Sequence, residues 1–181
     1  MAGMARRKTS LLRRFAEARK GAAAVEFALV ATPFLALMFG VLELGLVFMV
    51  STTLDNAVDT ASRKIRTGEL QTAGGTAETF KSAVCAEMAY LGPSCSANVH
   101  VDVRTFPKFA DVAITDPTTD GAFDEAKTTF APGTSESIVL VRVYYEWTLI
   151  TPMLNQGLES LSNGKRLIAA TATFRNEPYG S

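Results

Sequence analysis

Two carboxylates interrupt an otherwise apolar stretch near the N-terminus of this 181-residue chain. Glu26 stands at the start of the stretch and Glu43 near its end, and no formal charge occurs from Phe27 to Leu42. A carboxylate at the centre of a membrane costs roughly 2.5–3.5 kcal/mol on insertion scales, and less near the interface. Glu26 therefore either marks the edge of a membrane or has a cationic partner that offsets its charge.

The two cysteines are a second pair of residues that could do chemistry. Nine residues separate Cys85 from Cys95. In an exported protein, which meets an oxidising environment, such a pair favours a disulfide over two free thiols. A disulfide that closes this ten-residue loop would stabilise the fold by about 2–3 kcal/mol.

The single histidine, His100, lies beside Asp102 in a stretch of alternating apolar residues. One histidine alone does not form a metal site, so we interpret it as a plain surface histidine. The sequence shows no nucleophile–base arrangement, no glycine-rich phosphate loop and no cluster of metal ligands. It therefore predicts a protein that is not an enzyme and that needs no metal or cofactor.

The apolar stretch has the length of a membrane span. As a helix, Phe27–Val50 would cover roughly 36 Å, and a hydrocarbon core is about 30 Å thick. The first 21 residues hold seven basic residues and one acidic residue. Since basic flanks stay on the cytoplasmic side, we expect the N-terminus in the cytoplasm and the remainder exported.

The charges divide unevenly along the chain. Beyond residue 21 there are eleven basic and seventeen acidic residues. The exported part therefore has no cationic surface for phosphate, and we expect no nucleic-acid partner. Arg6-Arg7 lacks the residues that follow a twin arginine in export signals, and no small-residue cleavage site follows the apolar run. Both observations argue against a secreted enzyme.

The order of these features resembles the class III signal of type IV pilins and pseudopilins. That order is a basic leader, Gly21, four small or apolar residues, Glu26-Phe27 and a long apolar run. The sequence from Gly21 to Val30 and the segment Phe39-Gly40-Val41-Leu42-Glu43-Leu44-Gly45 resemble the TadE-like minor pseudopilins of the tight-adherence (Flp) pilus. Residues 144–154 and 173–179 show a weaker resemblance to the same family.

The resemblance implies that a prepilin peptidase cuts after Gly21 and leaves Ala22 as the new N-terminus. The amine of Ala22 would then pair with Glu26, which is followed by Phe27, within one helix or across to the next subunit. The other implied partners are minor pseudopilins, the major Flp pilin, the inner-membrane assembly platform and membrane lipid. We therefore expect a single-pass protein of the bacterial inner membrane, with a periplasmic C-terminal domain and a role in pilus assembly and cell adhesion.

Two interpretations of Glu43 remain open. It is either a residue at the outer boundary of the membrane or part of a helix-packing segment with Gly40 and Gly45, which would permit close helix approach. An alternative function for the whole chain is also open. It would keep residues 1–21 as a permanent single-pass anchor and display a periplasmic binding domain.

Apolar residues recur at intervals of three and four as far as Ile65, so the first helix is predicted to continue beyond the membrane. Gly68 follows basic residues of the last turn and is predicted to end it, and Pro33 predicts a kink. A second helix is predicted from Thr76 to the Gly92-Pro93 stop.

The remaining pattern is that of an antiparallel sheet. Strands are predicted over 97–104, 136–149 and 166–175, with a weaker extended segment over 109–115, a loop or hairpin over 116–133 and a short helix from Thr151-Pro152 to about Leu161. The aromatic residues of the strongest strand, Tyr144, Tyr145 and Trp147, are interpreted as sheet packing.

The predicted fold class is α+β. A long N-terminal transmembrane helix continues as the spine of a small exported domain, which has a second helix and an antiparallel sheet of three to four strands. The predicted division is a cleaved leader (1–21), a transmembrane helix (22–50), its exported continuation (51–70) and an α+β domain (71–181).

Overall fold

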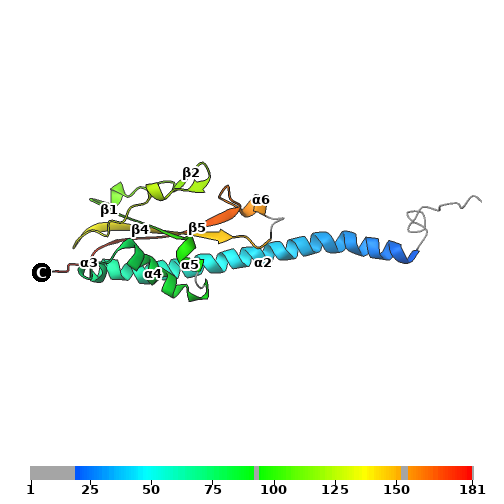
Figure 1. Ribbon diagram of the computed structural model, residues 1–181, viewed down its shortest axis with the longest axis horizontal. Coiled ribbons are helices and arrows are strands. Elements are labelled where there is room, and N and C mark those ends of the chain that lie inside the picture. The colour runs from blue at the N-terminus through cyan, green and yellow to red at the C-terminus, as the bar shows by residue number, and fades with distance from the viewer. Residues whose placement is uncertain (1–18, 92–93, 152–154, 181) are drawn as a thin grey trace, which may run out of the picture. The chain divides into compact units, whose positions relative to one another are not determined.

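The computed structural model describes residues 19–91, 94–151 and 155–180. It divides into two units, Met1–Leu42 and Glu43–Ser181. The described part of the first unit is helical, and the second unit contains the rest of that helix, the shorter helices and the sheet (Figure 1).

The longest element is α2, which runs from Arg19 to Arg66 over 48 residues and continues through Pro33. Its last turn holds the predicted basic residues, and Gly68 follows with a left-handed φ of 79°. The ring of Tyr179 packs so closely there that a Cβ on Gly68 would sit 2.4 Å from the ring. A glycine is therefore required both by the backbone conformation and by the C-terminal segment that packs over the helix end.

The second predicted helix is confirmed as α4, Ala77–Glu87, preceded by the one-turn helix α3, Glu69–Thr72. Thr76 caps α4, because its hydroxyl accepts from the amide of Thr79 while the Thr79 hydroxyl accepts from the amide of Thr76. A 3-10 turn, η1 (Ala89–Leu91), and a short helix, α5 (Ser94–Asn98), follow α4. The predicted stop at Gly92-Pro93 lies outside the described residues.

The main sheet has three antiparallel strands in the order β1-β4-β5. The strands are β1 (Val99–Phe106), β4 (Ile138–Thr148) and β5 (Lys165–Arg175). In the register, Val143 of β4 lies between Val101 of β1 and Ala170 of β5. Together with the helices this confirms the predicted α+β fold class. Strand β1 begins later than predicted because residues 94–98 form α5 instead.

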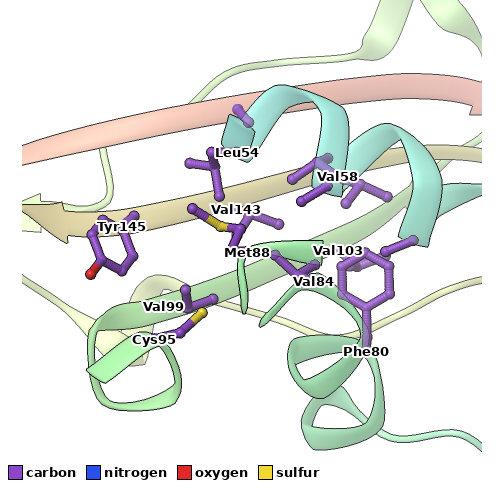
Figure 2. Packing of buried hydrophobic residues seen from close by; sticks show 14 of the residues in the cluster. Leu54, Val58, Phe80, Val84, Met88, Cys95, Val99, Val103, Val143 and Tyr145 are labelled. Atoms are coloured by element: carbon purple, nitrogen blue, oxygen red, sulfur yellow. The ribbon is translucent and has the colours of Figure 1, made fainter. Parts of the chain in front are cut away.

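The hydrophobic core lies between this sheet and the helices (Figure 2). It contains apolar side chains from one stripe of α2, from α4 and from the inward face of the strands, among them Leu54, Val58, Ile65, Phe80, Val84, Met88, Val99, Val103, Val143 and Tyr145. Phe80, Val84 and Met88, which recur at intervals of four along α4 and its C-terminal cap, are fully buried. The second half of α2 therefore has the spine role that its periodicity predicts.

The opposite face of the sheet is covered by the excursion between β1 and β4. It contains η2 (Phe109–Asp111), the small hairpin of β2 (Thr118–Thr119) and β3 (Ala122–Phe123), and η3 (Glu125–Lys127). The excursion over 116–133 is thus confirmed. Because it covers this face, Leu140, Arg142 and Tyr144 of β4 are buried there.

The segment predicted to be extended over 109–115 does not form a strand, although Val112 is extended. Its first residues form η2, and the carbonyl oxygen of Thr115 accepts from Arg142 Nη1 at 2.6 Å rather than from a neighbouring strand. The open edge of β1 is occupied instead by residues 129–131. The Val103 amide donates to Thr129 O at 2.6 Å, and the Ala131 amide donates to Val103 O at 2.8 Å.

The short helix predicted up to Leu161 ends earlier. The structure describes it as α6, Asn155–Leu158, while residues 152–154 lie outside the described part. The amides of Ser160 and Leu161 both donate to Lys165 O, which closes a turn into β5 instead of another helical turn.

The predicted disulfide is present. Cys85 on α4 is bonded to Cys95 on α5, with a Cα–Cα distance of 5.7 Å. Cys95 itself is buried in the core cluster. The bond therefore ties the end of α4 to the short helix that leads directly into β1.

Replacing both cysteines by serine should lower the free energy of unfolding of the second unit by about 2–3 kcal/mol, because the unfolded chain regains the entropy of the ten-residue loop. Trp147 is the only tryptophan, so its fluorescence during denaturant unfolding of the detergent-solubilised protein reports on this unit. Serine at the exposed Ala86 is the control. Equal stability of the double variant and the wild type would contradict the prediction.

Candidate functional site

The residues predicted for processing and charge pairing all lie on the N-terminal part of α2. Gly21, Ala22, Glu26 and Phe27 follow one another over two turns of helix. The side chains from Ala22 to Val30 are exposed, and Phe27 has 74% of its surface accessible. The segment therefore presents an apolar surface with one carboxylate at its start.

The exposure continues along the first unit. Many of its large apolar side chains are more than half exposed, among them Leu29, Phe34, Leu37 and Val41. Among the described residues, one helix is long and apolar enough to cross a membrane, and it is this one. Since soluble monomers rarely expose a contiguous apolar surface of this size, the segment has the properties of a membrane span. A single N-terminal helix of this kind fits a single-pass membrane protein.

The two glycines predicted for helix packing have different surroundings. Gly40 is partly buried, whereas a Cβ on Gly45 would meet open space within 4 Å. The second unit thus leaves room beside Gly45. Close approach of another helix at Gly40 and Gly45 remains a prediction.

Glu43 has the most elaborate polar environment on this helix. It is only 1% exposed, and it is the first residue of the second unit. Its Oε2 accepts from the backbone amides of Ile150 and Thr151, and from the Thr151 hydroxyl, each at 3.0 Å. Its Oε1 accepts from Trp147 Nε1 at 3.3 Å. The carboxylate therefore has four donors from residues more than a hundred positions away.

The end of β4 creates this arrangement. The strand ends at Thr148, and the chain then turns so that two successive amides, of Ile150 and Thr151, point to the same oxygen atom. Leu149 between strand and turn is buried, which anchors the turn. Two adjacent amides and a hydroxyl form an anion-binding concavity of the kind found where successive N–H groups converge.

Neither interpretation of Glu43 drawn from the sequence named this role. The boundary interpretation placed Glu43 in no site, and the packing interpretation concerned other helices. The signal that could have found the role is the cost of a buried charge, since a single acid in a buried helix stretch needs donors. The sequence alone does not say which donors meet it.

The interpretation of His100 as a plain surface histidine is wrong. Its side chain is 13% exposed, and its ring stacks on Phe123 with centroids 4.0 Å apart. Nδ1 lies 2.5 Å from Glu125 Oε1 and Nε2 lies 3.5 Å from Glu146 Oε1. The error arises because the excursion, not the sheet, covers this position.

Glu146 also pairs with Lys165 Nζ at 2.8 Å. Burial acts to raise the pKa of the Glu146 carboxyl, but the hydrogen bond and the charge of Lys165, aided by His100, lower it below its ordinary value. The group of His100, Glu125, Glu146 and Lys165 therefore joins η3 of the excursion to the three strands of the sheet.

Sequence reasoning missed a buried ion pair on the same face. Asp102 accepts from Arg142 Nη2 at 2.6 Å, and both residues are almost inaccessible. Asp102 also accepts from Arg104 and from the Thr129 amide. The pair is cross-strand in register, so its residues stabilise the sheet and hold the excursion. Within the described residues there is no group of three or more side chains arranged to hold a metal ion.

Replacing Glu43 by alanine should lower the free energy of unfolding of the second unit by about 3 kcal/mol, because buried amide donors lose their acceptor. Glu43→Gln should lower it less, since one carbonyl oxygen remains, but its NH2 group would face the Trp147 N–H. Denaturant unfolding followed by Trp147 fluorescence measures both variants.

The control is Glu69→Ala, which removes an exposed carboxylate at the start of α3. It should change the free energy of unfolding by no more than about 0.5 kcal/mol. If Glu43→Ala were as stable as this control, the carboxylate would not hold the turn after β4.

Comparison with known proteins supports the resemblance noted from the sequence. Residues 21–63 match the model of a protein family described as TadE-like protein. The match begins at Gly21 and ends in the last turns of α2, so it covers the apolar segment and Glu43 but not the sheet. The weaker C-terminal resemblance remains a prediction. No curated protein and no solved structure matches the chain.

Proposed function

We propose that this protein, whose N-terminal helix is TadE-like, is a minor pseudopilin of a tight-adherence (Flp) pilus. The observation that carries the proposal is the family match over residues 21–63, which starts at the glycine predicted for cleavage. The family suggests a role related to the Tad pilus. The finer role, of a processed subunit that primes or assembles the pilus, is our inference.

In this proposal a prepilin peptidase cleaves the bond between Gly21 and Ala22. Glycine presents no side chain beside the scissile bond, and the basic residues before it hold that bond at the cytoplasmic face. The exposed apolar surface from Ala22 onward remains in the inner membrane. The second unit, with its disulfide, is then located in the oxidising periplasm, which agrees with the bonded cysteines.

Cleavage would create a cation beside Glu26. The new amine of Ala22 lies four residues before Glu26, one helical turn and about 6 Å along the axis. Glu26 is exposed on the helix, so it is accessible to the amine of its own chain or of a neighbouring subunit. Pairing across subunits would set the axial stagger of packed helices, because an unpaired charge in an apolar environment is costly.

The proposed partners follow from this assembly. They are the prepilin peptidase, other minor pseudopilins, the major Flp pilin and the assembly platform of the inner membrane. The large exported unit distinguishes the chain from very short major pilins and favours a minor subunit. A permanently anchored protein that keeps residues 1–21 is the alternative that the first experiment tests.

The mature protein purified from membranes should begin at Ala22. N-terminal sequencing, or intact mass, measures this directly. Gly21→Leu should leave the precursor uncut, because a bulky side chain would occupy the position of the glycine, whereas Gly45→Ala should be processed normally. A wild-type N-terminus at Met1 or Ala2, in cells with an active prepilin peptidase, would favour the permanent anchor.

Glu26→Gln keeps the size of the side chain but removes its charge, so it separates membrane insertion from assembly. The variant should insert and be processed, yet its association with other pilins should weaken about 10- to 100-fold, the loss expected for a charge-assisted hydrogen bond. Co-purification from detergent extracts measures this loss. Glu26→Asp should restore little of this association, because its shorter side chain must span the same distance to the Ala22 amine.

The matched control is Asp55→Asn, which neutralises an exposed acid on the same helix beyond the predicted membrane span. It should co-purify like the wild type. Normal pilus assembly by Glu26→Gln would instead leave Glu26 as a marker of where the membrane begins.

A further inference from the structure

Strand β5 forms an edge of the sheet, and the middle of this edge is open. The backbone groups of Lys165 and Leu167 that point away from β4 are occupied, because Lys165 O accepts from Ser160 and Leu161 and the Leu167 amide donates to Ser160 Oγ. At the other end, the Glu177 amide donates to Arg66 O. Since backbone groups alternate between the two sides of a strand, those of Ala169, Thr171 and Thr173 also point outward.

These three residues have no hydrogen-bond partner for their outward groups among the described parts of the chain, and all three are exposed. Edge strands are usually protected by charges, proline, bulges or short length. Here the eight residues from Leu167 to Phe174 carry no charge and no proline, and the pairing with β4 is regular throughout. The edge is therefore suited to accept another strand.

A hollow of about 390 Å³ lies beside this edge, between β5 and one flank of α2. It is lined by Asp59, Ser62, Arg63, Arg66, Ala172, Thr173 and Phe174. Ser62 is 3% exposed, and its hydroxyl has no hydrogen-bond partner among the described residues. A buried polar atom without a partner is uncommon, and the residue that carries it here is among those that line a space far larger than the roughly 30 Å³ that one water molecule takes in the liquid.

The lining of the hollow carries two arginines, Arg63 and Arg66, and one acid, Asp59. Arg66 pairs with Glu177 at 3.3 Å, whereas neither Asp59 nor Arg63, which is exposed one turn before the end of α2, forms an ion pair with any described residue. An acidic side chain that lies over the hollow would meet Arg63. A polar atom that enters the hollow would supply the missing partner of Ser62.

We propose that an extended segment of a different exported chain, uncharged except for one acidic residue opposite Arg63, adds to β5 as a fourth strand and places side chains in the hollow. Its backbone would pair with the outward groups of Ala169, Thr171 and Thr173. This mode of recognition takes affinity from main-chain hydrogen bonds and specificity from the side chains that fill adjacent pockets.

A second copy of the chain is a poorer occupant. Two copies that pair symmetrically through β5 place their two β5 strands antiparallel. The two-fold axis of such a pair is perpendicular to the sheet, so it reverses every direction in the plane of the sheet. Within the second unit α2 runs along the strands (Figure 1), so the two copies would enter their domains from opposite ends. Copies anchored in one membrane enter from the same end. This step rests on the proposed function, because it requires the membrane anchor.

The test is photo-crosslinking of the full-length protein in pilus-producing cells, with benzoylphenylalanine at position 171. Mass spectrometry should find an adduct with an exported chain other than this one, at a segment that contains Asp or Glu. Thr173→Pro removes an outward N–H that β4 does not use, so it should lower the adduct yield about tenfold. Thr173→Val keeps the N–H and should leave the yield unchanged.

A second matched pair keeps the test valid if the proline variant is poorly folded. Arg63→Glu should lower the yield about tenfold, whereas Lys64→Glu, an exposed change of the same charge outside the hollow, should not. An adduct of two copies of this chain, no adduct, or equal yields within both pairs would overturn the proposal.

The N-terminus of the same sample separates the two proposals. A mature chain that begins at Ala22 but forms no adduct overturns strand addition alone. An uncut chain that forms the adduct, with the expected effects of Thr173→Pro and Arg63→Glu, supports strand addition and overturns the proposed processing.

Discussion

The buried carboxylate of Glu43 constrains how the second unit is built. Once removed from water, it needs donors on both oxygen atoms, and Trp147, Ile150 and Thr151 supply them. A buried charge that is left without its partners costs about 3–5 kcal/mol, which is a large fraction of the free energy of unfolding of a domain. Packings that separate the end of β4 from Glu43 are therefore strongly disfavoured. The position of the central strand along α2 follows from this requirement.

The sheet has only three strands, yet β4 is buried on both faces. Helices α2 and α4 cover one face with apolar side chains, and the excursion covers the other through a polar network around Asp102, Arg142 and His100. A small domain has little interior for its surface, so burial of a second face adds stability that one face could not supply. The disulfide adds to it by holding α5 at the start of β1.

Two carboxylates on the same helix have opposite surroundings. Glu43 is satisfied entirely by its own chain, whereas Glu26 is exposed in an apolar segment. The outward backbone groups in the middle of β5 and the Ser62 hydroxyl resemble Glu26, because they too have no hydrogen-bond partner among the described residues. All three features fit a subunit that completes its interactions in an assembly, which is the function we propose.

Local pattern was sufficient to predict much of the fold. The spacing of apolar residues predicted α2, Gly68 predicted where α2 ends, Thr76 predicted where α4 begins, and the alternation of valines predicted β1. The cysteine spacing predicted the disulfide, and the residues around Gly21 predicted the family that the comparison then matched. Each of these signals depends on residues close together in the chain, where geometry follows from helix and strand periods.

The tertiary structure alone decided which distant groups meet. The sequence contains Glu43 and Trp147, but only the packing of β4 on α2 brings their side chains within hydrogen-bonding distance. It likewise contains His100, which alternates with apolar residues as a surface residue would, but the excursion buries it against Phe123. Such contacts depend on the whole arrangement of the sheet, because a buried polar group requires a partner without specifying which one.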